Sequence, residues 1–101
     1  MKAFLITPEQ QSVEAIDIAD RDEIAKIIGF DTIESDAIGT GSDRLYFDEE
    51  CFLRGSGGRF RVDNLIPISG KAVVVGVAGN GATLCDAAVD IENLRGRIKY
   101  V

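Results

Sequence analysis

The sequence predicts an α+β domain, in which a largely antiparallel, twisted sheet packs against one main short helix, with a second helix near the C-terminus. Segments of strand length recur along the chain, and the most apolar of them spans residues 72–77. Residues 21–28 show the clearest combination of helical periodicity and capping residues. A chain of 101 residues without repeats or linkers is expected to form a single domain, residues 1–101.

The N-terminal segment has the pattern of a β-hairpin. Residues 3–6 are continuously apolar and end at Thr7 and Pro8, which predicts a buried strand followed by a turn. Residues 12–18 are rich in β-branched side chains and alternate in part, so we expect them to form the return strand.

The main helix is expected over residues 21–28. Asp20 is a good N-cap, Glu23 stands at the capping-box position, and Gly29 supplies a C-terminal stop. The isoleucines of this segment, Ile24, Ile27 and Ile28, share one helical face. Because a helix of two turns is marginal alone, we expect this face to pack on the sheet.

The middle of the chain is predicted to form short strands separated by turns. Residues 30–38 predict an irregular strand, followed by a loop over residues 39–42. Residues 45–47 predict a strand that turns at 48–50. Residues 51–54 are then expected to be its partner strand, with a further short strand at 60–62.

The valine-rich segment 72–77 is apolar on both faces, which predicts a strand in the interior of the sheet. Asn80-Gly81 is typical of a hairpin turn and would pair this strand with residues 82–86.

The C-terminal segment admits two interpretations. Residues 83–95 fit one helix, with Thr83 as its cap and Gly96 as its stop. The favoured interpretation is a strand at 82–86, a short helix at 90–95 capped by Asp90, and a final strand at 97–100.

Composition excludes several chemistries. The chain has no histidine, which removes Ser-His-Asp and Cys-His catalysis and His-ligated metals. Cys51 and Cys85 lack metal-ligand or redox spacing, and thiols are expected for both in a cytoplasmic protein. No apolar run reaches 18 residues, and the start of the chain lacks the pattern of a signal peptide. We therefore expect a cytoplasmic protein that is no enzyme, with no cofactor, metal or membrane partner.

Three other motifs have ordinary structural interpretations. Residues 79–81 lack the third glycine of a dinucleotide fingerprint, so we interpret them as a turn. The acids Asp48, Glu49 and Glu50 are consecutive, which favours a solvated turn over converging carboxylates. Cys51 and Cys85 have acidic neighbours in the sequence, which is unfavourable for a reactive thiolate.

The most promising binding segment is the glycine-rich stretch 54–61. Arg54, Arg59 and Arg61 offer planar donors for phosphate, and Phe60 offers a stacking face for a base. If residues 59–61 form an alternating strand, however, Phe60 would point into the core and the stacking face would be lost. The competing interpretation is a solvated hairpin loop whose charges keep an edge strand soluble.

The charge is distributed unevenly along the chain. The net charge is −6, with 13 acidic and 4 basic residues in positions 1–50, a net of −9. Positions 51–101 hold 4 acidic and 7 basic residues, a net of +3. The overall sign disfavours non-specific binding to nucleic acid, while the C-terminal set of Arg95, Arg97 and Lys99 would extend a basic patch if the fold brings it to the loop.

Four segments form a recognisable series along the chain: MKAFLI (1–6), LYFDEE (45–50), FLRG (52–55) and ISGKAVVVG (68–76). Together they resemble a phage and bacterial family of small domains of unknown function, the domain-of-unknown-function family 3846. Cys51 stands where the family often has glycine, which leaves the turn type open. The resemblance implies a phage or mobile-element setting and supplies no catalytic residues.

Two functional hypotheses follow. The first is a small non-enzymatic accessory protein that binds another protein or itself, with the valine-rich strand pair as a dimer surface. The second is a binder of nucleic acid or of a phosphate ligand, which would use Arg54, Arg59, Phe60 and Arg61.

Overall fold

The computed structural model describes residues 1–39, 41–54, 58–78 and 83–101, apart from the side chains of Phe52 and Arg54. Its elements, in chain order, are β1 (Lys2–Thr7), β2 (Ser12–Asp17), α1 (Arg21–Ile28), β3 (Ile33–Ala37), β4 (Asp43–Asp48), α2 (Cys51–Arg54), β5 (Arg59–Val62), β6 (Ile68–Ser69), β7 (Ala72–Ala78), β8 (Thr83–Cys85), α3 (Ile91–Arg97) and β9 (Ile98–Tyr100). Among the described helices, none is long and apolar enough to cross a membrane.

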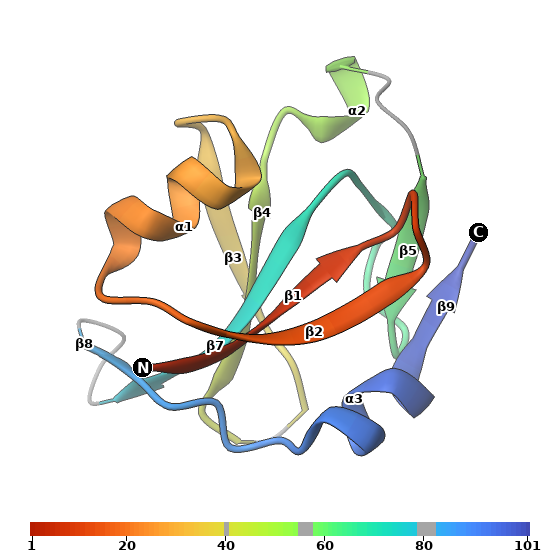
Figure 1. The fold of residues 1–101 in the computed structure, drawn as a ribbon. Helices are drawn as coiled ribbons and strands as arrows, with labels where there is room; N and C mark the ends of the chain where they lie inside the picture. Colours follow the sequence, from red (N-terminus) through yellow and green to blue (C-terminus); the bar gives the residue numbers. More distant parts are fainter. Residues whose placement is uncertain (40, 55–57, 79–82) are drawn as a thin grey trace.

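Two antiparallel sheets build the molecule, as Figure 1 shows. The larger sheet has the order β2-β1-β7-β4-β3, and β8 also pairs with β7. The smaller sheet has the order β6-β5-β9. The predicted α+β class with a largely antiparallel sheet is therefore confirmed.

Strand β7 lies in the interior of the larger sheet, between β1 and β4, as the apolar run predicts. Residues 72–77 are all buried. This burial corrects the expectation that the valine-rich strands form a dimer surface, because β7 presents neither a free edge nor an exposed face to a second copy.

Helix α1 forms where its caps predict. The Asp20 carboxylate accepts a hydrogen bond from the Glu23 N–H at 3.1 Å, and Glu23 accepts one from the Ala19 N–H at 3.1 Å. Gly29 ends the helix at a φ of 93°, a conformation that glycine adopts without strain. Ile24 is fully buried, and the helix packs against β4 and β7.

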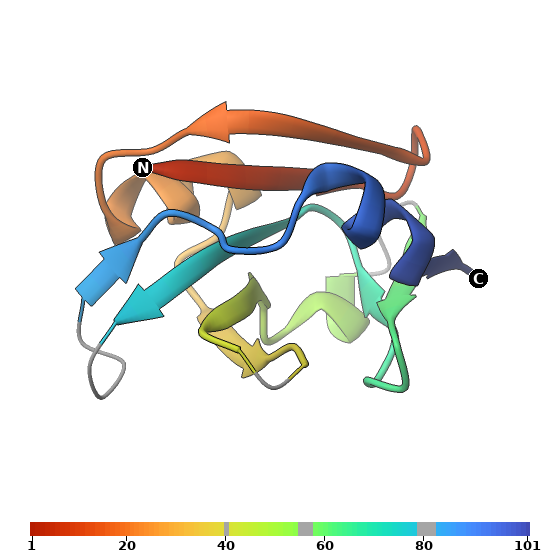
Figure 2. The same cartoon turned by 90° about the horizontal axis from the view of Figure 1, so that it is seen from below.

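The opposite face of the larger sheet carries the main core. Phe4 and Leu45 from this sheet pack with Phe60 of β5 and Leu94 of α3. Figure 2 shows β5, β9 and α3 closing over this side, away from α1. The fold thus has three layers, with the larger sheet in the middle.

Residues 51–54 are a helical turn, which corrects the predicted partner strand. The Asp48 carboxylate accepts a hydrogen bond from the Glu50 N–H at 3.1 Å, and the Leu53 N–H donates to the Glu50 carbonyl at 2.9 Å. These bonds bend the chain directly after β4 and place Cys51, 2% exposed, in the core. The amino acids of 51–54 suit a strand, but the local hydrogen bonds favour a turn.

The favoured C-terminal interpretation is confirmed. β8 pairs with β7, although the expected turn at residues 80–81 lies outside the described residues. Asp90 caps α3 by accepting from the Asn93 N–H at 2.8 Å, and β9 follows directly. Gly96 lies inside the helix and does not stop it.

Candidate functional site

Strand β5 separates the residues of the predicted binding loop into two faces. Phe60 is fully buried and packs in the main core, whereas Arg59 is exposed and Arg61 is partly buried. The alternation of a strand produces this separation. Phe60 therefore offers no stacking face, and its expected role as a base-binding residue is corrected.

The pairing of β5 with β9 builds a basic face on the smaller sheet. Arg61 lies directly opposite Lys99, and Arg59 follows on the same face of β5. The Nε atom of Arg61 is buried and has no hydrogen-bond partner among the residues that the structure describes. We call Arg59, Arg61 and Lys99 the basic face. The side chain of Arg54 and residues 55–57 lie outside what the structure describes.

The other two C-terminal arginines have partners elsewhere. Arg97 donates to the Asp63 carboxylate, with an Nε–Oδ1 distance of 3.0 Å. This ion pair lowers the pKa of Asp63 and raises the pKa of Arg97. Arg95 pairs with Glu92 at 2.8 Å and donates to the Val13 carbonyl at 3.0 Å. Of the C-terminal set, only Lys99 extends the basic patch.

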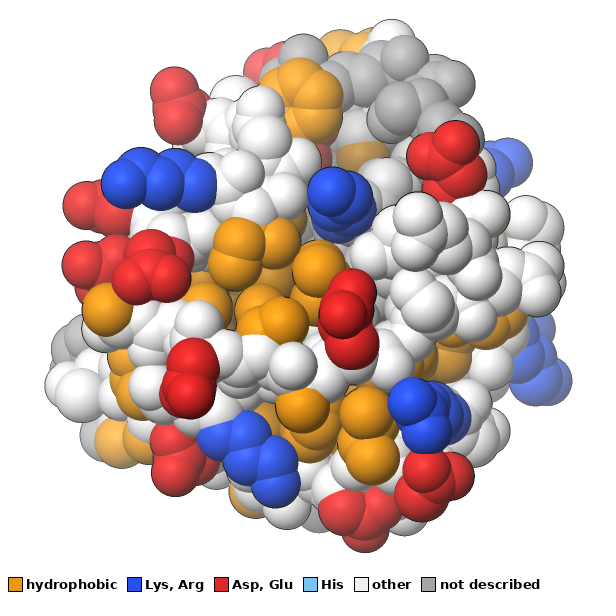
Figure 3. All heavy atoms as spheres, viewed as in Figure 1, with side chains coloured by type: hydrophobic (Ala, Val, Ile, Leu, Met, Phe, Trp, Pro, Cys, Tyr) orange, Lys and Arg blue, Asp and Glu red, His pale blue; other side chains and the backbone are white. Residues whose placement is uncertain are grey.

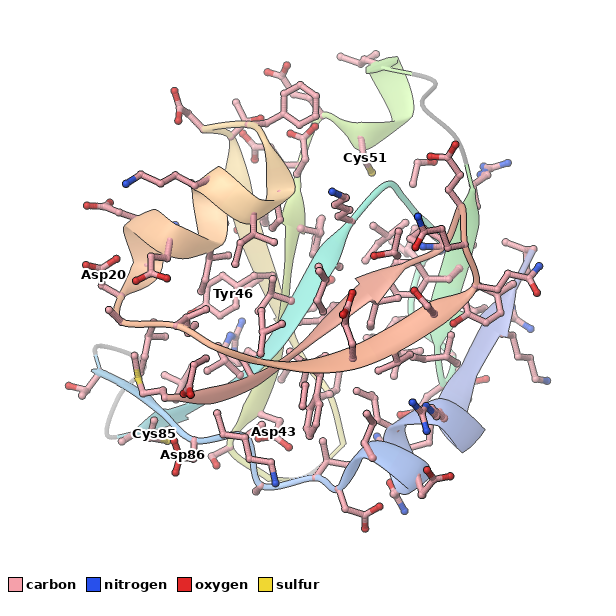
Figure 4. The ribbon with its side chains drawn as sticks, viewed as in Figure 1. Asp20, Asp43, Tyr46, Cys51, Cys85 and Asp86 are labelled. Atoms are coloured by element: carbon pink, nitrogen blue, oxygen red, sulfur yellow. The ribbon has the colours of Figure 1, made fainter. Side chains whose placement is uncertain are left out.

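The buried carboxylates serve the backbone. Asp43, 6% exposed, accepts hydrogen bonds from the Ala88 and Val89 N–H groups at 2.8 and 2.9 Å. Asp48, 3% exposed, accepts from the Thr32 hydroxyl, which corrects its interpretation as part of a solvated turn. Figure 4 shows Asp43 beside the segment that leads to α3. These carboxylates do not converge on a substrate site.

The next acid of the turn, Glu49, differs from Asp48 in its exposure to solvent. Glu49 is exposed, and a hydrogen bond with the Glu34 carboxyl raises its pKa, reinforced by the negative charge of that group. Within the described ranges, no group of three or more Cys, Asp or Glu side chains is placed to hold a metal ion. Cys51 and Cys85 are free thiols and lie at opposite ends of the molecule (Figure 4).

A groove that the sequence did not predict lies beside α1. It has a volume of about 380 Å³ and is formed by the β1–β2 turn, the end of α1 and the β6–β7 turn. Its apolar lining includes Pro8, Ile27 and Phe30, while Lys26 and Lys71 supply positive charge. Phe30 is 36% exposed, which is high for a large apolar side chain.

An apolar strip on the larger sheet meets this groove at Ile27. Leu5 of β1 and Ile16 of β2 face the α1 side and are only partly buried. Helix α1 packs against β4 and β7, which leaves the β1–β2 part of this face less covered. Figure 3 shows the resulting exposed hydrophobic area between α1 and β2. We call the groove and this strip together the α1 groove.

The sequence contains only a partial signal for this surface. The helical period places Ile27 on the apolar face of α1, but the structure buries Ile24 and Ile28 and leaves Ile27 partly exposed. A scan against protein-family models matches no family, and searches of the curated proteins and of the solved structures find no similar chain. The family resemblance therefore stays a prediction.

Proposed function

We propose that this chain is a non-enzymatic interaction protein that binds another protein through the α1 groove. The observation that carries the proposal is the apolar surface formed by the partly buried side chains of Leu5, Ile16 and Ile27 next to Phe30, which is 36% exposed. Exposed contiguous apolar surface commonly marks a site of protein association. Aromatic and aliphatic side chains of this kind serve as anchors at the centre of interfaces.

The chemistry of the chain supports a binding role over catalysis. The sequence has no histidine to act as a base near neutral pH. Asp43 and Asp48 already accept hydrogen bonds from other groups of the protein, which leaves them poorly suited to acid–base work on a substrate. We place this interaction in the cytoplasm of a phage-infected or element-carrying bacterium, on the resemblance noted in the sequence.

The proposal is tested by a matched pair of substitutions. Ile16→Gln changes the α1 groove, and Ile66→Gln makes the same change at a side chain that is 71% exposed in the β5–β6 connection. In pull-downs from host lysate read by mass spectrometry, wild type and Ile66→Gln should retain a common partner that Ile16→Gln loses. Equal capture by both variants would remove the α1 groove as the binding surface.

A second copy of the chain is the other partner that this surface would accept. Sedimentation velocity of the wild type distinguishes the two cases, because a homodimer gives a concentration-dependent mass that Ile16→Gln should reduce. A monomer at all concentrations would exclude a homodimer formed through the α1 groove.

The second candidate function is binding of a phosphate ligand or nucleic acid at the basic face. The cross-strand pairing of Arg61 with Lys99 favours it, because it brings basic side chains from two distant segments together. Planar guanidinium groups suit phosphate oxygens. Without Phe60, this binding would rest on charge alone, and its affinity would fall steeply with salt.

Titration of a labelled single-stranded oligonucleotide at low and moderate salt tests this candidate. Arg59→Ala/Arg61→Ala should weaken binding, whereas Lys26→Ala/Lys71→Ala, which removes the same charge from the α1 groove, should not. If both double variants bind as the wild type does, or if the wild type does not bind at low salt, the basic face has no such function.

A further inference from the structure

The chemistry of the α1 groove indicates what kind of segment it binds, an inference that rests on the proposed function. We infer that the α1 groove accepts a partner-protein segment in which an apolar anchor side chain is flanked by acidic residues. The volume of about 380 Å³ lies near the lower end of the range for ligand pockets, roughly 300–1,000 Å³. Such a volume suits an anchor side chain with its flanking backbone.

Two lysines on different elements border the apolar lining. Lys26 belongs to the last turn of α1, and Lys71 lies in the β6–β7 turn directly before β7. Both side chains are exposed. Within the described part of the chain, neither ammonium group takes part in an ion pair or a hydrogen bond. Both charges are therefore available to a partner.

The charge of the groove contrasts with that of the N-terminal half of the chain. Positions 1–50 hold 13 acidic and 4 basic residues, yet the pocket part of the α1 groove is lined by two lysines and one acid, Glu9. A second acid, Glu14, lies on the strip, directly opposite Leu5. An acidic segment gains contact-range attraction from Lys26 and Lys71, whereas a basic segment meets like charge there. Charges at the rim of an interface act mainly on specificity and association rate.

The apolar lining and the lysines would have separate roles. Pro8, Ile27 and Phe30 would bury the anchor and supply most of the affinity. The aliphatic stems of Lys26 and Lys71 extend apolar cover around the anchor, while their ammonium groups stay in water. Acidic residues on both sides of the anchor would contact these ammonium groups. The expected order in the partner segment is therefore an acidic residue, the apolar anchor and a second acidic residue.

Selection from a displayed library of random dodecapeptides tests the inference. Peptides selected on the wild type should be enriched in Asp and Glu on either side of an apolar residue. The variant Lys26→Glu/Lys71→Glu should select Lys and Arg at those positions. Arg59→Glu/Lys99→Glu, which changes the net charge equally at the basic face, should select the same peptides as the wild type.

The outcomes separate this inference from the function on which it rests. Peptides without acidic enrichment, or an unchanged preference in Lys26→Glu/Lys71→Glu, would overturn the acidic-partner inference. Protein binding at the α1 groove would still hold if Ile16→Gln abolished capture of the selected peptides. Capture that is insensitive to Ile16→Gln would overturn both. Thermal melts of every variant confirm that the compared proteins are folded.

Discussion

At the scale of single residues, the buried carboxylates hold irregular backbone in place. Residues 86–90 connect β8 to α3 outside any strand or helix, and the Ala87 N–H donates to the Lys2 carbonyl of β1 at 2.9 Å. The Asp43 carboxylate satisfies two N–H groups of this segment, and the Asp86 carboxylate accepts from the Lys2 N–H at 2.8 Å. The Asp43 carboxylate, 6% exposed, is the acceptor on which these two partly buried hydrogen bonds depend. The Asp43 side chain thus accepts the backbone hydrogen bonds that a neighbouring strand would accept within a sheet.

Asp43→Ala should therefore destabilise the protein far more than removal of an exposed acid. Loss of the carboxylate leaves the N–H groups of Ala88 and Val89 without their acceptor, at a cost of about 1–3 kcal/mol for each unsatisfied group. Asp36→Ala, at an exposed position of β3, should change the free energy of unfolding by less than about 0.5 kcal/mol. Denaturant titration measures both, and similar values would contradict the assigned role of Asp43.

The Asp63–Arg97 pair makes stability depend on pH in a defined direction. Its hydrogen bond lowers the folded-state pKa of Asp63 below the ordinary 3.8. The stabilisation is thus fully present above pH 3.8 and is lost as the pH falls through the lower, folded-state pKa. Because the Asp63 side chain is 38% exposed, solvent screening limits the effect to about 0.5–1 kcal/mol.

Asp63→Asn is the suitable variant, because asparagine tolerates the positive φ of 52° at this position. Its deficit in unfolding free energy relative to wild type should be present at pH 7 and should shrink well below pH 3.8. Denaturant titrations at both pH values test this. A deficit of the same size at low pH would mean that the charge of Asp63 contributes nothing.

At the scale of elements, those with local signals were predictable from the sequence. Helix α1 and its caps, the β1–β2 hairpin and the interior position of β7 all follow from residues within each element. The helical turn α2 does not, because its cause is a hydrogen bond from the Glu50 N–H to the Asp48 side chain. Side-chain bonds of this kind are decided by geometry and leave no periodic pattern.

The two proposed binding surfaces were predictable only in part, because each depends on contacts between segments that are distant in the sequence. Alternation places Arg59 and Arg61 on one face of β5, but Lys99 joins them only through the β5–β9 register. The α1 groove depends on where α1 lies across the larger sheet, and this leaves Ile16 only partly buried. Neither the register of distant strands nor the position of a helix on a sheet is encoded in local periodicity.

Replacement of glycine by alanine should change the stability of the protein in opposite directions at Gly76 and Gly96. At Gly76, in β7, an added Cβ would meet the Asp86 carbonyl oxygen and lie 2.9 Å from Cys85 Sγ. Gly76→Ala should therefore force β7 and the 85–86 segment apart and cost about 1–3 kcal/mol. At Gly96, in α3, an added Cβ meets nothing within 4 Å, so Gly96→Ala should stabilise by about 0.4–1 kcal/mol. Thermal melts of both variants measure these changes. A higher melting temperature for Gly76→Ala than for the wild type would contradict the close approach of β7 to the 85–86 segment.

At the scale of the whole molecule, arginines occupy both edges of the larger sheet. On β2, Arg95 donates to the Val13 carbonyl, and α3 packs against this strand. On β3, Arg44 donates from Nη2 to the Ser35 carbonyl at 2.9 Å and from Nε to its hydroxyl at 3.0 Å. Exposed edges otherwise invite strand pairing between molecules. An arginine at each edge thus limits edge-to-edge pairing of the larger sheet.

Arg44→Ala should open the β3 edge and promote self-association. The variant frees the Ser35 carbonyl for an N–H of another chain, while Glu34 and Asp36 on the same strand still oppose pairing by charge. Sedimentation velocity should show a rise in mass with concentration for Arg44→Ala, and the rise should be larger at high salt, which screens these acids. Arg59→Ala removes an equal charge from the basic face and should sediment as the wild type does. If the mass of Arg44→Ala rises with concentration no more than that of Arg59→Ala, the acidic residues of β3, and not Arg44, protect this edge from strand pairing.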